Sequence, residues 1–326
     1  MTALFRINGI IQEEFKMAIT AGMVKELREK TGAGMMDCKK ALNATDGNME
    51  AAVEHLREQG LAKAEKKAGR IAAEGLVATK LSDDGKKAAI VEVNSETDFV
   101  AKNEQFQTYV AEVADQALTT GAADIEAFLA EESKAEAGKT VKEVLDGKIA
   151  IIGENLNIRR FAQMESAAGF VASYIHAGGK IGVLVEVETD VVNDEIKEMG
   201  KNVAMQVAAI MPKYTSRDEV SKDYIDHETE ILKAQAKNEN PDKPDNIIEK
   251  MIIGRLNKEL KEVCLLDQTY VKAEDGKQAV GKYVEEVAKA NSAKIAIKGF
   301  IRFETGEGIE KKEENFAEEV AKQMNQ

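Results

Sequence analysis

Gly75-Leu-Val-Ala-Thr79 and Ile90-Val-Glu-Val93 flank the turn-forming sequence Ser82-Asp-Asp-Gly85. Two runs rich in β-branched residues, separated by a turn that contains Asp and Gly, predict an antiparallel β-hairpin. The same pattern occurs again further along the chain, as Gly169-Phe-Val-Ala-Ser173 and then Leu184-Val-Glu-Val187. Self-similarity over such a distance indicates that the chain contains two copies of one folding unit.

Each copy continues beyond its hairpin with a helix and one more strand. Apolar residues at helical spacing follow the hairpins at 106–113 and 196–207, and strand-like runs close the copies at 157–161 and 299–303. We therefore predict an α+β fold with a core in which a unit of hairpin, helix and strand is duplicated. The first copy is expected at 75–166, and the second at 167–211 and 291–307.

A long insertion at 212–290 interrupts the second copy between its helix and its last strand. Residues 220–234 and 248–260 each carry one narrow apolar stripe, on either side of the proline-containing stretch 238–245. Two helices with one stripe each can bury those stripes only against each other. The sequence thus predicts a protruding antiparallel coiled-coil hairpin.

The residues before the repeat predict a small three-helix module at 17–61. Thr31-Gly-Ala-Gly34 is expected to stop its first helix, and Gly60 its third. A linker helix follows at 62–74. Its basic run, 63–70, is more often a solvated face than a phosphate-binding site, and we interpret it as a linker.

The first sixteen residues do not match a secretory signal, because the acidic pair Glu13-Glu14 follows the short apolar part. Gln12-Glu13-Glu14 can be encoded by a purine-rich string that resembles a bacterial ribosome-binding site. The hypothesis is that residues 1–16 are a translated leader or a disordered extension, and that the native chain begins at Met17.

Composition and charge narrow the possible classes of function. The chain has 45 basic and 58 acidic residues and a net charge of −13, which disfavours broad binding to nucleic acid. Cys38 and Cys264 lie far apart, so neither a disulfide framework nor a metal knuckle is expected. Apolar runs fall short of the roughly 20 residues that span a bilayer. We expect a cytoplasmic protein with no membrane and no direct nucleic-acid partner.

Motifs for covalent chemistry or nucleotide binding are absent from the sequence. G-x-x-x-x-G-K-[ST] does not occur, and Thr31-Gly-Ala-Gly34 follows a helix rather than a strand, so it is not a phosphate cradle. Three histidines and two distant cysteines offer no zinc ligand set, and G-x-S-x-G is missing. We expect no cofactor and no enzyme activity. A hydrolase triad assembled from residues outside known motifs remains an alternative.

The connector after the first hairpin, NSETDFVAKN at 94–103, places Phe99 among polar residues. With Thr97-Asp98 aligned to Thr189-Asp190 of the second copy, the first connector is two residues longer and has Phe99 where the second has a valine. The extra length gives Phe99 more freedom to project outward. In the alternative, Phe99 packs beneath the next helix as a hydrophobic staple and Asp98 caps that helix.

Four stretches of the chain resemble the bacterial translation elongation factor Ts family, over a region from about Met17 to the C-terminus. They are REKTGAGMMDCKKAL at 28–42, TDFVAK at 97–102, IGENLNIRR at 152–160 and GFIRFE at 299–304. The resemblance implies a guanine nucleotide exchange factor that binds elongation factor Tu in its GDP-bound and nucleotide-free forms. It also implies a module like ubiquitin-associated domains at 17–61 and a C-terminal module at 308–326.

The resemblance assigns roles to individual residues as well. It implies that four residues disturb the partner's magnesium: Thr97, Asp98, Phe99 and Val100. It implies contacts with the partner from five more: Met35, Met36, Ile152, Gly153 and His176. Methionines are common in cores as well as at interfaces, and His176 could equally be a satisfied hairpin residue. A rival of another class is an adaptor that binds some other protein without nucleotide chemistry.

Overall fold

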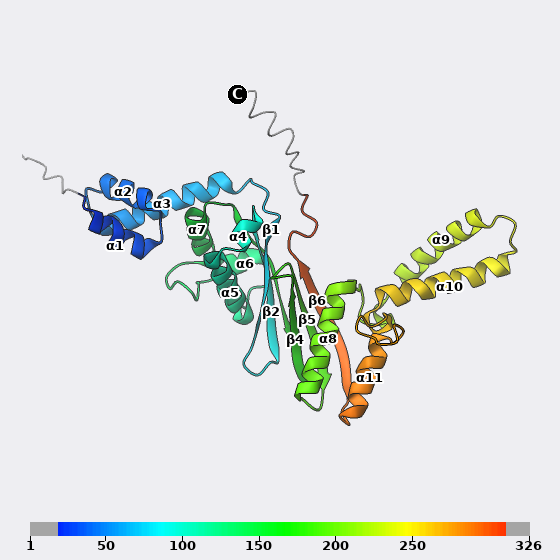
Figure 1. Cartoon of the computed structure of the whole chain (residues 1–326). Coiled ribbons are helices and arrows are strands. Elements are labelled where there is room, and N and C mark those ends of the chain that lie inside the picture. The colour runs from blue at the N-terminus through cyan, green and yellow to red at the C-terminus, as the bar shows by residue number, and fades with distance from the viewer. Residues whose placement is uncertain (1–18, 311–326) are drawn as a thin grey trace, which may run out of the picture. The chain divides into compact units, whose positions relative to one another are not determined.

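The computed structural model describes residues 19–310, which combine helices with two three-stranded antiparallel sheets (Figure 1). The mixed α+β fold class is therefore confirmed. The described residues divide into two compact units, one of 19–69 with 143–154 and the other of 70–142 with 155–310. The leader hypothesis for 1–16 lies outside the described residues, as does 311–326 of the predicted C-terminal module. No helix within 19–310 is long and apolar enough to cross a membrane.

The first unit is helical. It contains α1 (Ala21–Thr31), α2 (Met35–Ala44), α3 (Met49–Lys67) and most of α7 (Val141–Ile152). Side-chain oxygens of Thr20 and Asn48 cap α1 and α3, and Gly32 ends α1 with a φ of 67° that favours glycine. Its small core gathers buried residues of α1, α2 and α3, among them Leu27, Cys38 and Leu42.

Gly60 does not end the third helix, as the sequence predicted, because α3 continues to Lys67. Gly60 is buried, and a Cβ atom at this position would stand 3.3 Å from the Cβ of Ala150 on α7. The glycine therefore serves the close approach of two helices rather than the termination of one. The predicted linker helix at 62–74 is helical only as far as Lys67.

The second unit contains both sheets. β1 (Glu74–Leu81), β2 (Lys87–Ser95) and β3 (Leu156–Glu165) form the first, with β2 in the middle. β4 (Gly169–His176), β5 (Ile181–Thr189) and β6 (Ile295–Glu304) form the second, with β5 in the middle. The register of each middle strand against its third strand shifts at one place, at Glu92/Val93 and at Glu186/Val187. The two sheets thus share their strand order and the position of their irregularity.

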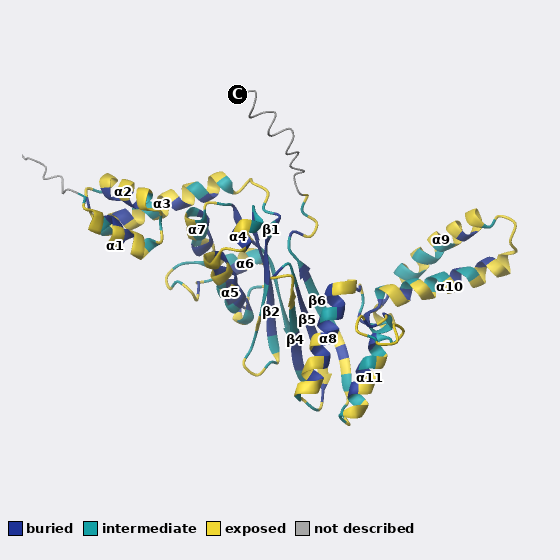
Figure 2. Ribbon diagram, viewed as in Figure 1, coloured by how far each residue is buried: buried dark blue, intermediate teal, exposed yellow. Residues whose placement is uncertain are grey.

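Helices cover the sheets of this unit. α4 (Asp98–Ala101) and α5 (Glu104–Thr119) pack on the first sheet, α6 (Ile125–Ala130) lies against β3, and α8 (Asp194–Ile210) packs on the second sheet (Figure 1). Val77, Ile90, Val171, Leu184 and Phe303 form a buried cluster that joins residues of both sheets. Figure 2 shows buried residues on the strands of both sheets and on parts of α8.

The insertion contains a helical hairpin and a part of the core. Its elements are η1 (Arg217–Glu219), α9 (Lys222–Glu239), α10 (Asp245–Val263), η2 (Leu265–Asp267) and α11 (Val280–Ala290). Val220 near the start of α9 clusters with Leu260 near the end of α10, and Ala236 near the end of α9 with Ile248 near the start of α10. The two helices therefore run antiparallel.

The protruding part is shorter than the predicted 212–290. Val280, Val284 and Val287 of α11 belong to the same buried cluster as α8 and β5, together with Leu265 and Tyr270. In Figure 1, α11 lies beside β6, away from the α9 and α10 pair. The apolar stripe of α11 has ordinary helical spacing, and its true partner is the second copy of the repeat rather than the hairpin.

Candidate partner-binding site

The connector between β2 and α5 forms a single helical turn, α4, that carries Phe99 at the surface. Thr97 caps this turn, since its Oγ1 accepts a hydrogen bond from the Val100 amide at 3.4 Å. Val100 is buried, and the side chain of Asn103 caps the following helix α5. The backbone on both sides of Phe99 is therefore anchored to the core.

Phe99 itself is 79% exposed. A hydrophobic staple beneath α5 would be buried, so that alternative is wrong, and α5 takes its cap from Asn103 rather than from Asp98. The Lys102 ammonium lies 5.8 Å from the centroid of the ring. Single exposed apolar side chains are ordinary on protein surfaces. What distinguishes Phe99 is exposure on a turn whose flanks are fixed.

Asp98 places a negative charge beside the ring. Its Oδ2 accepts a hydrogen bond from Lys102 Nζ at 2.7 Å, and this bond, helped by the positive charges of Lys102 and Lys180, lowers the pKa of Asp98. Lys180 lies in the turn between β4 and β5 and forms an ion pair with Glu74. Asp98 therefore stays ionised at neutral pH.

His176 is the last residue of β4, where the turn to β5 begins. Its Nδ1 is 2.9 Å from the Tyr174 hydroxyl, and its carbonyl accepts hydrogen bonds from the amides of Gly179 and Lys180. The turn that starts at His176 thus carries the lysine that acts on Asp98. His176 itself contacts Tyr174 and its own turn, so its link to α4 runs only through Lys180.

The other predicted contact residues belong to the helical unit. Met35 and Met36, on the first turn of α2, are 59% and 63% exposed, while Cys38 and Leu42 occupy the core. The core interpretation of the two methionines is therefore wrong. A Cβ at Gly32 would meet Ile151 Cδ1 at 3.3 Å, so the loop before Met35 lies against α7.

Ile152 is half-buried at the end of α7, and Gly153 has a φ of 89° with its carbonyl accepting a hydrogen bond from Lys67. Ile151, which the sequence did not single out, is 38% exposed between this point and the α1 to α2 loop. In the sequence, Ile151 and Ile152 form an apolar pair at the end of an amphipathic helix. Periodicity alone assigns such a pair to a core, so it did not reveal that Ile151 is exposed. Among residues 19–310, no group of three or more His, Cys, Asp or Glu could hold a metal ion.

The sheet registers correct the alignment of the two connectors. Ser95 pairs with Leu156 at the end of β2, and Thr189 pairs with Ile295 at the end of β5. Both hydroxyls donate to the carbonyl two residues further on, at 3.0 Å to Thr97 and 2.9 Å to Val191. Thr189 therefore corresponds to Ser95, and aligning it with Thr97 is wrong.

With this correction, the extra residues of the first connector are those of α4 itself. Asn103 caps α5 and Asn193 caps α8 in the same manner, which fixes the other end of the comparison. The described residues of the second copy contain no counterpart of Asp98–Ala101 between these two points. Among the described residues, Phe99 thus stands on a segment that the first copy has and the second copy lacks.

Comparison with known proteins gives a consistent result. The family model for Elongation factor TS matches residues 96–307. A protein named Elongation factor Ts from Clostridioides difficile (strain 630) is 60% identical over 306 residues, which cover 94% of this chain and 99% of the relative. Proteins of the same name from Clostridium botulinum (strain Eklund 17B / Type B) and Clostridium tetani (strain Massachusetts / E88) are 54% and 53% identical over 306 residues, again covering 94% and 99%.

Proposed function

Because the chain belongs to the elongation factor Ts family, we propose that it is a guanine nucleotide exchange factor for elongation factor Tu. It binds the GDP-bound partner, promotes release of GDP and remains on the nucleotide-free form until GTP binds, in translation elongation. It makes and breaks no covalent bonds, and its effect is a change in the affinity of another protein for its ligand.

The observation that carries this proposal is the turn α4, with Phe99 exposed between anchored flanks. In the family, the Thr-Asp-Phe-Val segment disturbs the partner's magnesium, and here Thr97 and Val100 hold the turn while Phe99 acts as the wedge. The ionised Asp98 brings negative charge towards a site that holds a cation and phosphates. A charge placed there changes the binding of both, because bound cations dominate local electrostatics.

Energetics show that the turn needs help from other contacts. By linkage, a factor that weakens GDP binding is itself bound more weakly in the presence of GDP to the same degree. A hundredfold effect needs about 2.7 kcal/mol of coupling. Burying one Phe side chain yields roughly 1.5–3 kcal/mol, and only part of it is coupled. Contacts from Met35, Met36, Ile152, Gly153 and His176 supply the remaining affinity in our proposal.

Release of a fluorescent GDP analogue from purified elongation factor Tu tests the function. We expect release to accelerate with the concentration of the chain and to saturate. An adaptor or a hydrolase would leave the release rate unchanged at every concentration, and that result would exclude the exchange function.

A further inference from the structure

The connector that carries Phe99 is held at its base by Glu96, which no motif assigned to the site. The Glu96 Oε1 atom accepts a hydrogen bond from the backbone amide of Asn155 at 2.6 Å and lies 3.5 Å from Nη1 of Arg70. Asn155 is buried, and its Nδ2 donates to the carbonyl of Arg70 at 2.7 Å. One carboxylate therefore ties the connector to the start of β3 and to the chain that enters β1.

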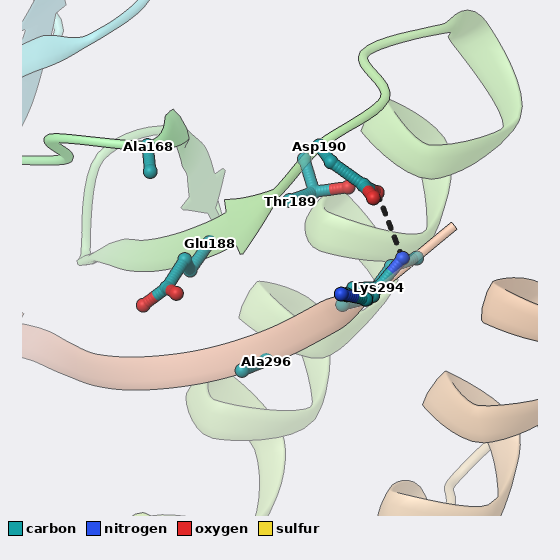
Figure 3. Close-up of a pocket in the computed structure, with 7 residues that line it drawn as sticks. Ala168, Glu188, Thr189, Asp190, Lys294 and Ala296 are labelled. Carbon is teal, nitrogen blue, oxygen red and sulfur yellow. Dashed lines mark hydrogen bonds between the residues drawn. The ribbon is translucent and has the colours of Figure 1, made fainter.

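The second copy contains the same backbone link without the wedge. Asp190 follows Thr189 as Glu96 follows Ser95, and its Oδ1 accepts from the amide of Lys294 at 2.8 Å (Figure 3). Lys294 precedes β6 as Asn155 precedes β3. Around this link lies an open pocket of about 240 Å³, lined by Ala168, Glu188, Thr189, Asp190, Lys294, Ile295 and Ala296.

The two links lie at equivalent corners of the two sheets, but the chain continues from them into different segments. Only Val191 and Val192 lie between Asp190 and the residue that caps α8. After Glu96, in contrast, the chain first forms α4. A helix of one turn is not stable by itself, because the first turn fixes several residues for a single hydrogen bond. The direction in which α4 presents Phe99 therefore depends on its anchors.

We propose that Glu96 is a positioning residue for nucleotide exchange, which holds the base of the connector so that Phe99 meets the partner in one orientation. This inference rests on the proposed function of the α4 segment. An anchored Phe99 loses less conformational freedom on binding than a mobile one would. More of its binding free energy is therefore available to favour the complex without GDP. Glu96 itself touches neither the nucleotide nor the magnesium in this scheme.

The test compares Glu96→Ala, Glu96→Gln and the matched variant Asp190→Ala in the full chain. GDP release from elongation factor Tu is measured at saturating factor, together with the unfolding midpoint of each variant. Glu96→Ala should slow release about two- to tenfold, the range that one hydrogen bond contributes. Glu96→Gln keeps an acceptor oxygen for the Asn155 amide and should restore most of the rate. Asp190→Ala should lower the midpoint comparably and leave release unchanged.

A double variant separates positioning from general stability. If Glu96 acts through Phe99, then Glu96→Ala combined with Phe99→Ala should be no slower than Phe99→Ala alone. Multiplied effects, or equal slowing by Asp190→Ala, would overturn the inference. Should Phe99→Ala slow release while Glu96→Ala does not, only the positioning role fails. An unchanged rate with Phe99→Ala would overturn both the proposed function of α4 and this inference.

Discussion

At the scale of single residues, Phe99 is held in water although its side chain would gain roughly 1.5–3 kcal/mol from burial. The apolar residue next to it, Val100, is buried and secures the turn. The fold therefore does not use the Phe99 ring. A large apolar group left unused on an anchored turn is suited to insertion into another surface.

Replacement of Phe99 by Ala should separate stability from function. Because the ring is exposed, we expect the free energy of unfolding to change by less than about 0.5 kcal/mol. GDP release should slow roughly tenfold, since part of the insertion energy is lost. The matched control is Val192→Ala, which removes a 50% exposed apolar side chain from the corresponding connector of the second copy.

Stopped-flow release of fluorescent GDP and urea unfolding monitor the two properties. If Phe99→Ala melts much earlier while exchange per folded molecule stays intact, the ring has a structural role. Equal slowing by Val192→Ala would mean that exposed apolar surface of any kind on these connectors is sufficient.

Glu92 should make the stability of the first sheet depend on pH. The side chain is fully buried in β2, and its oxygens accept hydrogen bonds from Asn94, Arg159, Arg160 and the amide of Gly306. Burial by itself would raise the pKa of Glu92, but these hydrogen bonds and the positive charge of Arg160 outweigh it, so the pKa is lowered from its ordinary 4.5.

The stabilisation from Glu92 should be complete above pH 4.5 and should be lost as the pH falls through the lower pKa of the folded state. Glu92→Gln should cost about 2–4 kcal/mol at pH 7, because the two arginines then face an uncharged side chain. This cost should shrink below pH 4. Urea unfolding across this range checks it, with Glu186→Gln at the corresponding bulge of the second sheet as control. A cost that stays constant with pH would contradict the assignment.

Sequence patterns predicted little of this residue-scale detail. The run Val91-Glu-Val93 alternates as in a strand with one wet face, which puts Glu92 in solvent. Its burial depends on Arg159 and Arg160 from β3 and on the turn after β6, and no local pattern reports such distant partners. The exposure of Phe99, in contrast, was one of the two outcomes that the comparison of the connectors predicted.

At the scale of elements, the insertion separates into a free hairpin and an integrated helix. Backbone hydrogen bonds join the two ends of the hairpin at its base. The amide of Tyr214 donates to the carbonyl of Val263, and the carbonyl of Tyr214 accepts from the amide of Leu265. Figure 2 shows exposed and half-buried residues along most of α9 and α10. The buried residues of this pair lie along the seam between the two helices and at its base, where Leu260 packs with Val220 and Cys264.

Removal of residues 222–260, with a short Gly-Ser turn in their place, should leave the core folded. The unfolding midpoint, measured by circular dichroism, should fall by no more than a few degrees, because most of the lost contacts lie within the hairpin. Removal of 212–290 takes α11 as well and should unfold the second copy, because three valines leave the cluster with α8. Equal stability of the two deletions would show that α11 is not a core element.

The sequence located α9 and α10 through their stripes and the prolines between them, but it could not assign α11. Val280, Val284 and Val287 form a stripe of the same kind as the stripes of the hairpin. Periodicity shows that a helix has a buried face, and it does not show which element covers that face. The long segment from η2 to α11 therefore appeared to belong to the hairpin.

At the scale of the whole molecule, the proposed contacts fall in two compact units. Met35, Met36, Ile152 and Gly153 belong to the helical unit, whereas α4 and His176 belong to the unit with the sheets. Composition and patterning predicted the fold class. The identity of the partner came from family resemblance alone, because an exchange factor has no set of metal ligands and no reactive group from which its function could be predicted.

The two units should make different thermodynamic contributions to exchange. The pair Met35→Ala and Met36→Ala removes apolar contact surface, so it should weaken binding to GDP-bound and nucleotide-free elongation factor Tu alike, by about 1–2 kcal/mol in total. Phe99→Ala should instead reduce the ratio between the two affinities, because the wedge acts where the nucleotide is held. Isothermal titration of each variant against both forms of the partner measures these quantities.

The triple variant completes this test. If the helical unit supplies uniform affinity and α4 supplies coupling, the free-energy losses should add within about 0.5 kcal/mol, as they do for sites that share no contacts. If the two methionine substitutions change the ratio of the two affinities, then the helical unit also contributes to the coupling. Strong non-additivity would mean that both units press on one element of the partner, so that neither can be assigned affinity or coupling alone.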